Sequence, residues 1–275
     1  MKSKIRLGIL GGGGDSLIGI VHRIASSMHD KYSIIGGVFN PDYSENLKFA
    51  KEIGLDESRV YEDYDKMIQE ELKLDKSQRM QVVSILTPNF LHYPMAKKLL
   101  ENNFNVICEK PMTTTYEEAL DLERIYKSKK LTFAVTYTYT GYPMIRQMKE
   151  MIKNGIIGDI QRVDLQYYQG WINPIIHDTV KRSETWRLQP DKSGISCCIG
   201  DIGTHAFDML EYVTGMEVKE LLSDLNYVYD DNTMDVDGTI LIRFSDKIKG
   251  VIRASQIATG EAVSYTHLRA HETNV

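Results

Sequence analysis

The sequence lacks the features of several large protein classes. It contains no run of about 18 consecutive apolar residues, so we expect no transmembrane helix. Its three cysteines, two of them adjacent at Cys197 and Cys198, are too few for a disulfide framework. Positive charge is not in excess, because 33 Lys and Arg face 38 Asp and Glu, for a net charge of −5. A nucleic-acid partner would need a concentrated basic face, so we expect none.

The chain also lacks the pattern of a secretory signal. Residues 1–10 lead directly into an apolar strand pattern and a glycine cluster, whereas a signal needs a longer apolar stretch and a cleavage site. Together with the few cysteines, this predicts a cytoplasmic protein with no membrane partner. The 42% of hydrophobic and 26% of charged residues are typical of a globular protein, and 275 residues suffice for two domains.

Strand and helix patterns alternate in the first half of the chain. Short apolar runs typical of buried parallel strands cover residues 5–10, 32–39, 82–86, 104–108 and 131–135. Helical patterns separate most of these runs. This alternation predicts an α/β fold with a doubly wound parallel sheet over residues 1–137.

The pattern changes in the second half. A helical segment at 143–154 is followed by longer strand patterns at 160–169, 220–229, 238–244 and 250–257. Alternating apolar and polar residues in these runs suit a sheet with one covered face. We therefore predict an α+β domain over 138–261, with a large, mostly antiparallel sheet. Residues 262–275 keep neither period, and we expect a non-native or disordered tail.

A glycine cluster lies between the first strand pattern and the first helical pattern. In this context glycines let backbone N–H groups approach a pyrophosphate at the helix amino terminus. Gly11 and Gly13 fit the fingerprint, whereas its third position is Ser16, and Asp15 adds a negative charge nearby. The alternative is a tight turn with a structural role only. The residues expected to bind the cofactor here are Gly11, Gly13, Gly14, Ser16 and Leu17.

The end of the second strand pattern bears on the choice between NAD and NADP. An acidic residue there suits a free ribose 2′-hydroxyl, and a basic residue suits a 2′-phosphate. The chain has Asn40 and Asp42 at this point, and no arginine until Arg59. We expect Asn40 to bind the cofactor and favour NAD, with NADP as the alternative.

Lys110 follows the strand pattern at 104–108. Thr115 and Glu118 have capping-box spacing and mark the start of the next helix. Ligands of an open α/β sheet bind beyond the carboxyl ends of its strands. We therefore expect Lys110 to point into a ligand crevice.

Asp201 and His205 are four residues apart in a helical pattern, which places both side chains on one helix face. A carboxylate beside an imidazole raises its basicity and fixes its orientation, as a proton-abstracting histidine requires. A satisfied surface pair is the alternative. A zinc site with Cys197 and Cys198 is not expected, because adjacent cysteines do not easily share one tetrahedral ion and no second Cys-x-x-Cys follows.

Two further segments carry candidate substrate contacts. Trp186 and Arg187 precede the helix of Asp201, so the guanidinium could bind an oxygenated substrate. A surface salt bridge explains Arg187 equally well. Tyr139 belongs to a tyrosine-rich stretch at the domain junction, and we expect it to line the pocket, although core packing explains most of these tyrosines.

Taken together, these motifs resemble the Gfo/Idh/MocA family, which includes glucose–fructose oxidoreductase and inositol dehydrogenase. The matching segments are Gly11 to Gly19 with His22-Arg23, Thr87-Pro88-Asn89 with His92, Glu109-Lys110-Pro111, Trp186-Arg187, and Asp201 with His205. The resemblance implies an NAD(P)-binding Rossmann domain followed by a substrate domain. It also implies cofactor contacts from Thr87, Pro88, Asn89, His92, Glu109 and Lys110.

The resemblance further implies a dehydrogenase that oxidises a secondary hydroxyl of a sugar, polyol or related carbohydrate, or reduces the ketone. Lys110 would lie at the nicotinamide and the substrate hydroxyl, with His205 as acid/base and Asp201 as its partner. The alternatives are an NAD-assisted glycosidase or eliminase of the same fold, and a non-catalytic dinucleotide or sugar sensor.

Family members continue beyond the last strand pattern found here, so we expect a chain truncated at its carboxyl terminus. Full-length relatives are expected to be homo-oligomers that use the open face of the large sheet. An unfinished sheet leaves an unpaired edge and an uncovered apolar face, which predicts low stability. A sharp thermal melt at an ordinary mesophilic temperature would refute that expectation.

Overall fold

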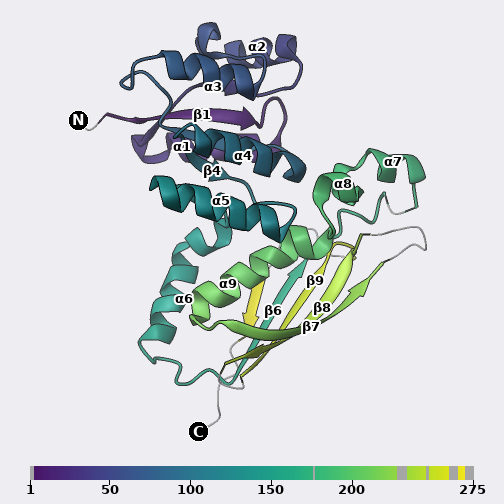
Figure 1. Cartoon of the computed structure of the whole chain (residues 1–275). Helices are drawn as coiled ribbons and strands as arrows, with labels where there is room; N and C mark the ends of the chain where they lie inside the picture. Colours follow the sequence, from purple (N-terminus) through teal and green to yellow (C-terminus); the bar gives the residue numbers. More distant parts are fainter. Residues whose placement is uncertain (1–2, 176, 228–233, 246–247, 260–265, 270–275) are drawn as a thin grey trace. The chain divides into compact units, whose positions relative to one another are not determined.

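The computed structural model describes residues 3–175, 177–227, 234–245, 248–259 and 266–269 (Figure 1). The chain divides into two compact units, Met1–Thr136 and Tyr137–Val275. None of the helices in the described ranges combines the length and the apolar character needed to cross a membrane.

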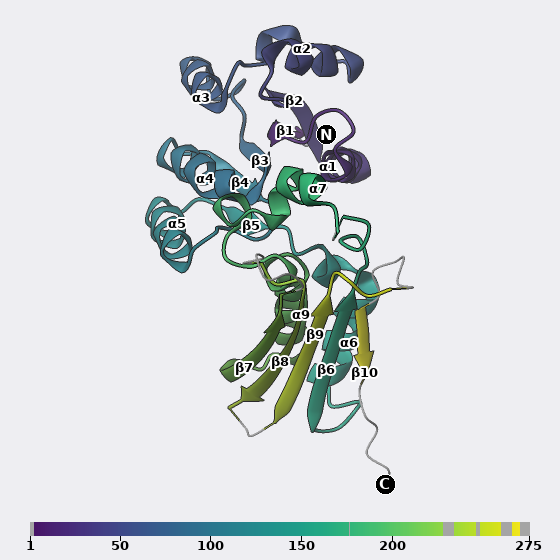
Figure 2. The same cartoon turned by 90° about the vertical axis from the view of Figure 1, so that its right-hand side faces the viewer.

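The first unit contains a parallel five-stranded sheet with the order β2-β1-β3-β4-β5 (Figures 1 and 2). The chain moves outward from β1 to β2 and then crosses to β3 on the other side, so β1 and β3 flank the topological switch point where such sheets bind ligands. The predicted parallel sheet is confirmed. Its strands are β1 (Ile5–Gly11), β2 (Tyr32–Val38), β3 (Val82–Leu86), β4 (Asn105–Cys108) and β5 (Phe133–Val135).

Both faces of this sheet are covered by apolar side chains. One cluster includes Val83 and Ile85 of β3 and packs against helices α3 to α5, and the other includes Leu7 and Ile9 of β1 and packs against α1 and α2. Strand residues alternate between the two clusters because successive side chains point to opposite faces. The helices are α1 (Leu17–Ser27), α2 (Tyr43–Glu52), α3 (Tyr64–Lys73), α4 (His92–Glu101) and α5 (Tyr116–Lys129).

Helix α5 begins where the sequence predicts. The Thr115 hydroxyl accepts the Glu118 N–H, and the Glu118 carboxylate accepts the Thr115 N–H, each over 3.3 Å. This capping box satisfies two backbone donors that a helix start leaves without partners.

The second unit contains a mixed five-stranded sheet with the order β10-β6-β9-β8-β7 (Figure 2). Three strand pairs are antiparallel and the β6–β9 pair is parallel, so the sheet is mostly antiparallel, as predicted. Its strands are β6 (Arg162–Tyr168), β7 (Val218–Asn226), β8 (Asp237–Phe244), β9 (Lys249–Ser255) and β10 (Thr266–Arg269). The helices are α6 (Pro143–Lys153), α7 (Thr179–Glu184), α8 (Pro190–Ser193) and α9 (Thr204–Thr214).

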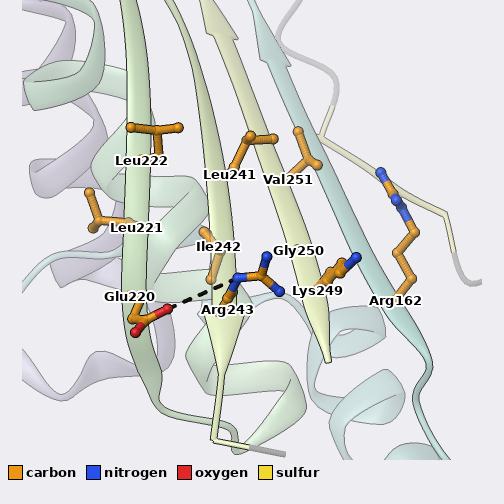
Figure 3. Close-up of a pocket in the computed structure, with 10 residues that line it drawn as sticks. All are labelled: Arg162, Glu220, Leu221, Leu222, Leu241, Ile242, Arg243, Lys249, Gly250 and Val251. Carbon is orange, nitrogen blue, oxygen red and sulfur yellow. Dashed lines mark ion pairs between the residues drawn. The ribbon is translucent and has the colours of Figure 1, made fainter. Parts of the chain in front are cut away.

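Among the described residues, helices cover one face of this second sheet and leave the other without a helix. Residues of α6 and α9 pack on Leu165, Ile240 and Ile252. The opposite face carries Leu222 and Leu241, which are 69% and 50% exposed and lie on paired positions of β7 and β8 (Figure 3). A shallow depression of about 360 Å³ on this face is rimmed by Arg162, Arg243 and Lys249.

The sequence predicts a non-native or disordered tail over residues 262–275, and the structure corrects the expectation of disorder for four of them. Thr266–Arg269 form β10, antiparallel to β6, with Thr266 opposite Tyr167. Strand β6 supplies backbone partners, and such pairing does not require a side-chain period in the added segment. Residues 262–265 and 270–275 of the tail lie outside the described residues, as do 228 and 229 of the strand predicted at 220–229.

Candidate active site

The glycine cluster forms a compact turn at the carboxyl end of β1. Gly11, Gly12 and Gly14 have φ values of 83°, 69° and 54°, a region that favours glycine. A Cβ atom added to Gly13 would lie only 2.7 Å from the carbonyl oxygen of Phe39. The turn therefore needs glycine at successive positions, as a backbone cradle for a pyrophosphate does.

Gly19 supplies the close helix–strand approach that the sequence interpretation assigned to position 16. A Cβ atom on Gly19 would lie 1.9 Å from the Gly12 carbonyl oxygen, so this crossing accepts glycine only. Ser16 instead caps α1, because its hydroxyl accepts the Gly19 N–H over 3.2 Å. The missed signal was a glycine eight positions after Gly11, in the first turn of α1. Leu17 is the first residue of α1 and is exposed.

The end of β2 offers an amide and no basic side chain. The Asn40 side-chain oxygen accepts the Asp42 N–H over 2.8 Å, and the Asp42 carboxylate caps α2. Hydrogen bonds from the Ser44 hydroxyl and from the Glu45 and Ser44 N–H groups hold the pKa of Asp42 below its ordinary value. Arg59 donates from its Nε to the buried Glu71 over 2.9 Å. Its guanidinium is thus bound to a carboxylate within the core.

The ends of β3 and β4 are tied together by His92. Its Nδ1 lies 2.7 Å from the Pro111 carbonyl oxygen, and its Nε2 lies 2.8 Å from the Thr87 carbonyl oxygen. Burial lowers the pKa of His92, although the two carbonyl groups oppose this shift. The ring has no exposed surface, so His92 acts here by joining the two loops. Pro88 and Asn89 follow Thr87 in the loop after β3, and Asn89 is buried.

Lys110 lies directly beyond β4, at the strand end where the sequence predicts it. Its backbone N–H donates to the Glu109 carboxylate over 3.2 Å. Glu109 is buried, and its other oxygen is 2.8 Å from His22 Nε2 and 2.6 Å from the Thr136 hydroxyl that donates to it.

In the second unit, Asp201 lies in a π-helical turn, Ile199–Gly203, that leads directly into α9. Such wide turns are rare and frequently occur at functional sites. The Gln256 side chain, fully buried, donates to Asp201 Oδ2 over 2.8 Å, and Arg187 Nε lies 3.8 Å from the same oxygen. Sequence reasoning missed Gln256, because it is 55 residues away and no motif marks it.

His205 lies in the first turn of α9 among three tyrosine rings. The ring centroids of Tyr139, Tyr137 and Tyr167 are 4.8, 5.7 and 6.3 Å from the imidazole. The hydroxyls of Tyr139 and Tyr167 are hydrogen-bonded to each other, and the Tyr137 hydroxyl is 2.7 Å from that of Thr204. The aromatic edges fix the orientation of the imidazole.

Two further side chains near this cluster are Arg187, which the sequence predicts as a substrate contact or a salt-bridge partner, and Asp208. The Arg187 guanidinium lies 4.4 Å from the centre of the Trp186 ring, so the two predicted substrate residues contact each other, and Arg187 also pairs with Asp201. Asp208, one turn after His205, was not predicted. Burial raises its pKa to about 6, the neighbouring Glu211 adds to this shift, and a hydrogen bond with Thr140 opposes it.

The structure thus groups the predicted residues in two sets. The first unit brings together the glycine turn, the loop after β3 and Lys110 at the strand ends of one sheet, and the second unit brings Tyr139, Asp201 and His205 to one helix start. In the ranges that the structure describes, no group of three or more His, Cys, Asp or Glu side chains is arranged to hold a metal ion.

Two models of one protein family match nearly the whole chain. Residues 5–137 match the model described as an oxidoreductase family with an NAD-binding Rossmann fold. Residues 145–272 match the model of the GFO/IDH/MocA C-terminal domain. The second match extends into the segment that the sequence interpretation treated as a non-native tail.

Individual proteins agree with these matches. An uncharacterised oxidoreductase of Bacillus subtilis is 33% identical over 263 residues, which cover 94% of this chain and 66% of the relative. A levoglucosan dehydrogenase of Pseudarthrobacter phenanthrenivorans is 34% identical over 138 residues, 49% of this chain and 33% of the relative.

Crystal structures of an inositol dehydrogenase homologue from Azotobacter vinelandii are similar along almost the whole chain. The complex with NAD+ has a TM-score of 0.91, and the complex with NADH and myo-inositol has a TM-score of 0.89. Both are 27% identical and cover 99% of this chain, but this chain covers 70% and 69% of theirs. The chain spans about two thirds of the Bacillus relative and a third of the levoglucosan dehydrogenase.

Proposed function

Because this chain belongs to the GFO/IDH/MocA family of oxidoreductases, we propose that it is an NAD-dependent dehydrogenase of carbohydrates. The reaction is oxidation of a secondary hydroxyl of a sugar or polyol, or reduction of the corresponding ketone. The similarity to a levoglucosan dehydrogenase and to an inositol dehydrogenase homologue supports this substrate class. The observation that carries the proposal is the position of Lys110 at a parallel strand end, in the same sheet as the glycine turn.

The residues at the strand ends fit a dinucleotide. The glycine turn and the start of α1 would hold the pyrophosphate, and a Cβ atom at Gly13 or Gly19 would distort this cradle because it would clash with the carbonyl oxygen of Phe39 or Gly12. Asn40 would bind a ribose hydroxyl, and the engagement of Arg59 by Glu71 favours NAD over NADP. When bound, the nicotinamide supplies the hydride acceptor, and the protein supplies alignment and proton transfer.

In this mechanism three side chains act on the substrate hydroxyl. His205 accepts the hydroxyl proton at a ring nitrogen, in an orientation set by the surrounding tyrosines. The Lys110 ammonium stabilises the negative charge that develops on the oxygen. Asp201, held by Gln256, orients the imidazole and the substrate.

The test is an absorbance screen for NADH with a panel of sugars and polyols, run on this chain and on a longer version with the length of its relatives. The proposal expects NADH formation with at least one secondary alcohol. Release of aglycone from a glycoside without net NADH would indicate the NAD-assisted glycosidase or eliminase instead. Binding of NAD with no turnover of any kind would indicate a sensor.

A further inference from the structure

Glu109 lies at the centre of a buried network that joins helix α1 to the Lys110 loop. His22 Nε2 is 2.8 Å from Glu109 Oε1, and the two side chains are only 15% and 11% exposed. His22 belongs to α1, the helix that begins directly after the glycine turn, and Glu109 is the residue before Lys110. One hydrogen-bonded pair therefore connects the helix after the glycine turn with the backbone of Lys110, the candidate catalytic residue.

The remaining contacts of this pair come from the neighbouring strands. The Thr136 hydroxyl, just after β5, donates to Glu109 Oε1 over 2.6 Å, and the Lys110 N–H donates to Oε2. Ser84 of β3 lies with its hydroxyl 3.2 Å from His22 Nδ1. With the serine hydroxyl donating to Nδ1, the proton of the imidazole is on Nε2 and points to Glu109.

The charge of Glu109 is maintained by these partners. Burial raises the pKa of the carboxyl, but the hydrogen bonds from His22 and Thr136 and the charge of Lys110 outweigh it, so the pKa is below its ordinary value. Both carboxylate oxygens accept hydrogen bonds from protein groups. This arrangement suits a group that holds other groups in place.

We propose that His22 and Glu109 are a positioning pair that couples dinucleotide binding at α1 to the placement of Lys110. A phosphate that draws the start of α1 into one position also fixes His22, and through Glu109 it fixes the backbone of Lys110. The catalytic meaning of this coupling rests on the proposed function, because only there does Lys110 contact a substrate. The coupling itself does not depend on any turnover.

The first experiment compares His22→Leu with His22→Gln. Leucine removes the donor to Glu109, whereas the glutamine amide retains an N–H that can reach it. We expect His22→Leu to weaken NAD binding by about tenfold, measured by titration calorimetry, which corresponds to the loss of one good hydrogen bond. Turnover at saturating NAD should fall by up to about 10²-fold, because a displaced group loses alignment. His22→Gln should recover most of both losses.

The second experiment measures the chemical reactivity of the Lys110 amine in the absence of any carbohydrate. Lysine amines are labelled with limiting acetic anhydride at fixed pH, with and without saturating ADP, and quantified by mass spectrometry. ADP carries the pyrophosphate and lacks the nicotinamide, so it does not occupy the place next to a substrate hydroxyl. We expect ADP to change the labelling of Lys110 in the wild type and in His22→Gln, and to have little effect in His22→Leu. The exposed Lys127 of α5 is the internal reference.

A matched pair of hydroxyl deletions separates coupling from stability. Thr136→Val removes a hydroxyl donor from the buried Glu109, and Tyr61→Phe removes one from the buried Glu71 over a similar 2.7 Å bond. Both variants should lower the melting temperature. Only Thr136→Val should weaken NAD binding and reduce the ADP effect on Lys110. If His22→Leu does not fold, Thr136→Val and Tyr61→Phe still test the coupling.

Normal NAD affinity and a normal ADP effect on Lys110 in folded His22→Leu or Thr136→Val would overturn the coupling and leave the pair a structural role. Absence of turnover with every carbohydrate would refute the proposed function alone, since calorimetry and labelling still decide the coupling.

Discussion

The two units hold their candidate residues in different ways. In the first unit the glycine turn, Thr87 and Lys110 each lie at or just after the end of a parallel strand, so sheet topology brings them together. In the second unit Asp201 and His205 lie at a helix start, and their contacts come from Gln256 and Tyr167, which are distant in the sequence. The backbone of the sheet thus places the residues of the first unit, whereas side-chain contacts place those of the second.

The two sheets also differ in how their faces are covered. The parallel sheet is covered on both faces, and every residue of β3 is buried. In the described part of the second unit, helices cover one face of the mixed sheet, and most residues of β7, the strand that bears Leu221 and Leu222 in Figure 3, are exposed. Substitutions should therefore have consequences that depend strongly on the unit and the face in which they lie.

The largest effect is expected at Lys110. Lys110→Ala should reduce turnover by about 10²–10⁴-fold, because it removes a charge placed where negative charge develops. NAD binding should change little, since the backbone cradle remains. Calorimetry and steady-state kinetics measure the two quantities. Lys127→Ala, an exposed lysine paired with Glu123, is the control and should match the wild type.

Two leucines test the difference between a covered and an open face. Leu100 is fully buried against the parallel sheet, and Leu222 is 69% exposed on β7. Leu100→Ala should lower the free energy of unfolding of its unit by about 2–5 kcal/mol. Leu222→Ala should change it by less than about 0.5 kcal/mol. Denaturant titration compares them, and equal losses would mean that the β7 face is covered in solution.

Gln256 tests the contribution of side-chain contacts in the second unit. Gln256→Leu removes the donor to Asp201 and leaves a carboxylate without that partner, at a cost of about 1–3 kcal/mol in unfolding free energy. Turnover should fall while NAD binding stays unchanged, because the glutamine lies outside the first unit. The control is Gln166→Leu on β6, where the glutamine is partly exposed. Unchanged turnover in Gln256→Leu would remove Gln256 from the mechanism.

The smallest effect is expected from Asp208, whose titration should make the stability of the protein depend on pH. Its pKa is raised from 3.8 to about 6 in the folded protein, chiefly by burial. The folded state therefore binds this proton more tightly than the unfolded state, and stability from this group is lost as the pH rises from about 4 to about 6. Asp208→Asn should be more stable than the wild type at pH 8, with the advantage shrinking toward pH 4. Melting curves across this range measure it, and a constant difference would contradict the shift.

Local patterns predicted the parallel sheet well. Strand β3 was expected at residues 82–86 and is found there, and Thr115 and Glu118 marked the start of α5. These elements are determined by apolar runs and caps within a few residues of each other. Lys110 was predictable for the same reason, because its position follows from the end of one strand.

Other features depend on contacts that no local pattern records. Gly19 is required because α1 crosses Gly12 closely, and that crossing is a property of the folded unit. The π-helical turn at Asp201, its contact with Gln256 and the pairing of β10 with β6 depend on residues far apart in the chain. Helix α3, Tyr64–Lys73, was missed although Asp63 caps it, because its apolar residues are few.

The most direct test of the whole account is a double-mutant cycle on NADH formation, with Lys110→Ala, His205→Ala and the variant that carries both. Groups that act on the same hydroxyl are strongly non-additive, so the double variant should be about as slow as the slower single variant. Wild-type turnover in either single variant, or losses that simply multiply in the double variant, would contradict the proposal that Lys110 and His205 act in the same step.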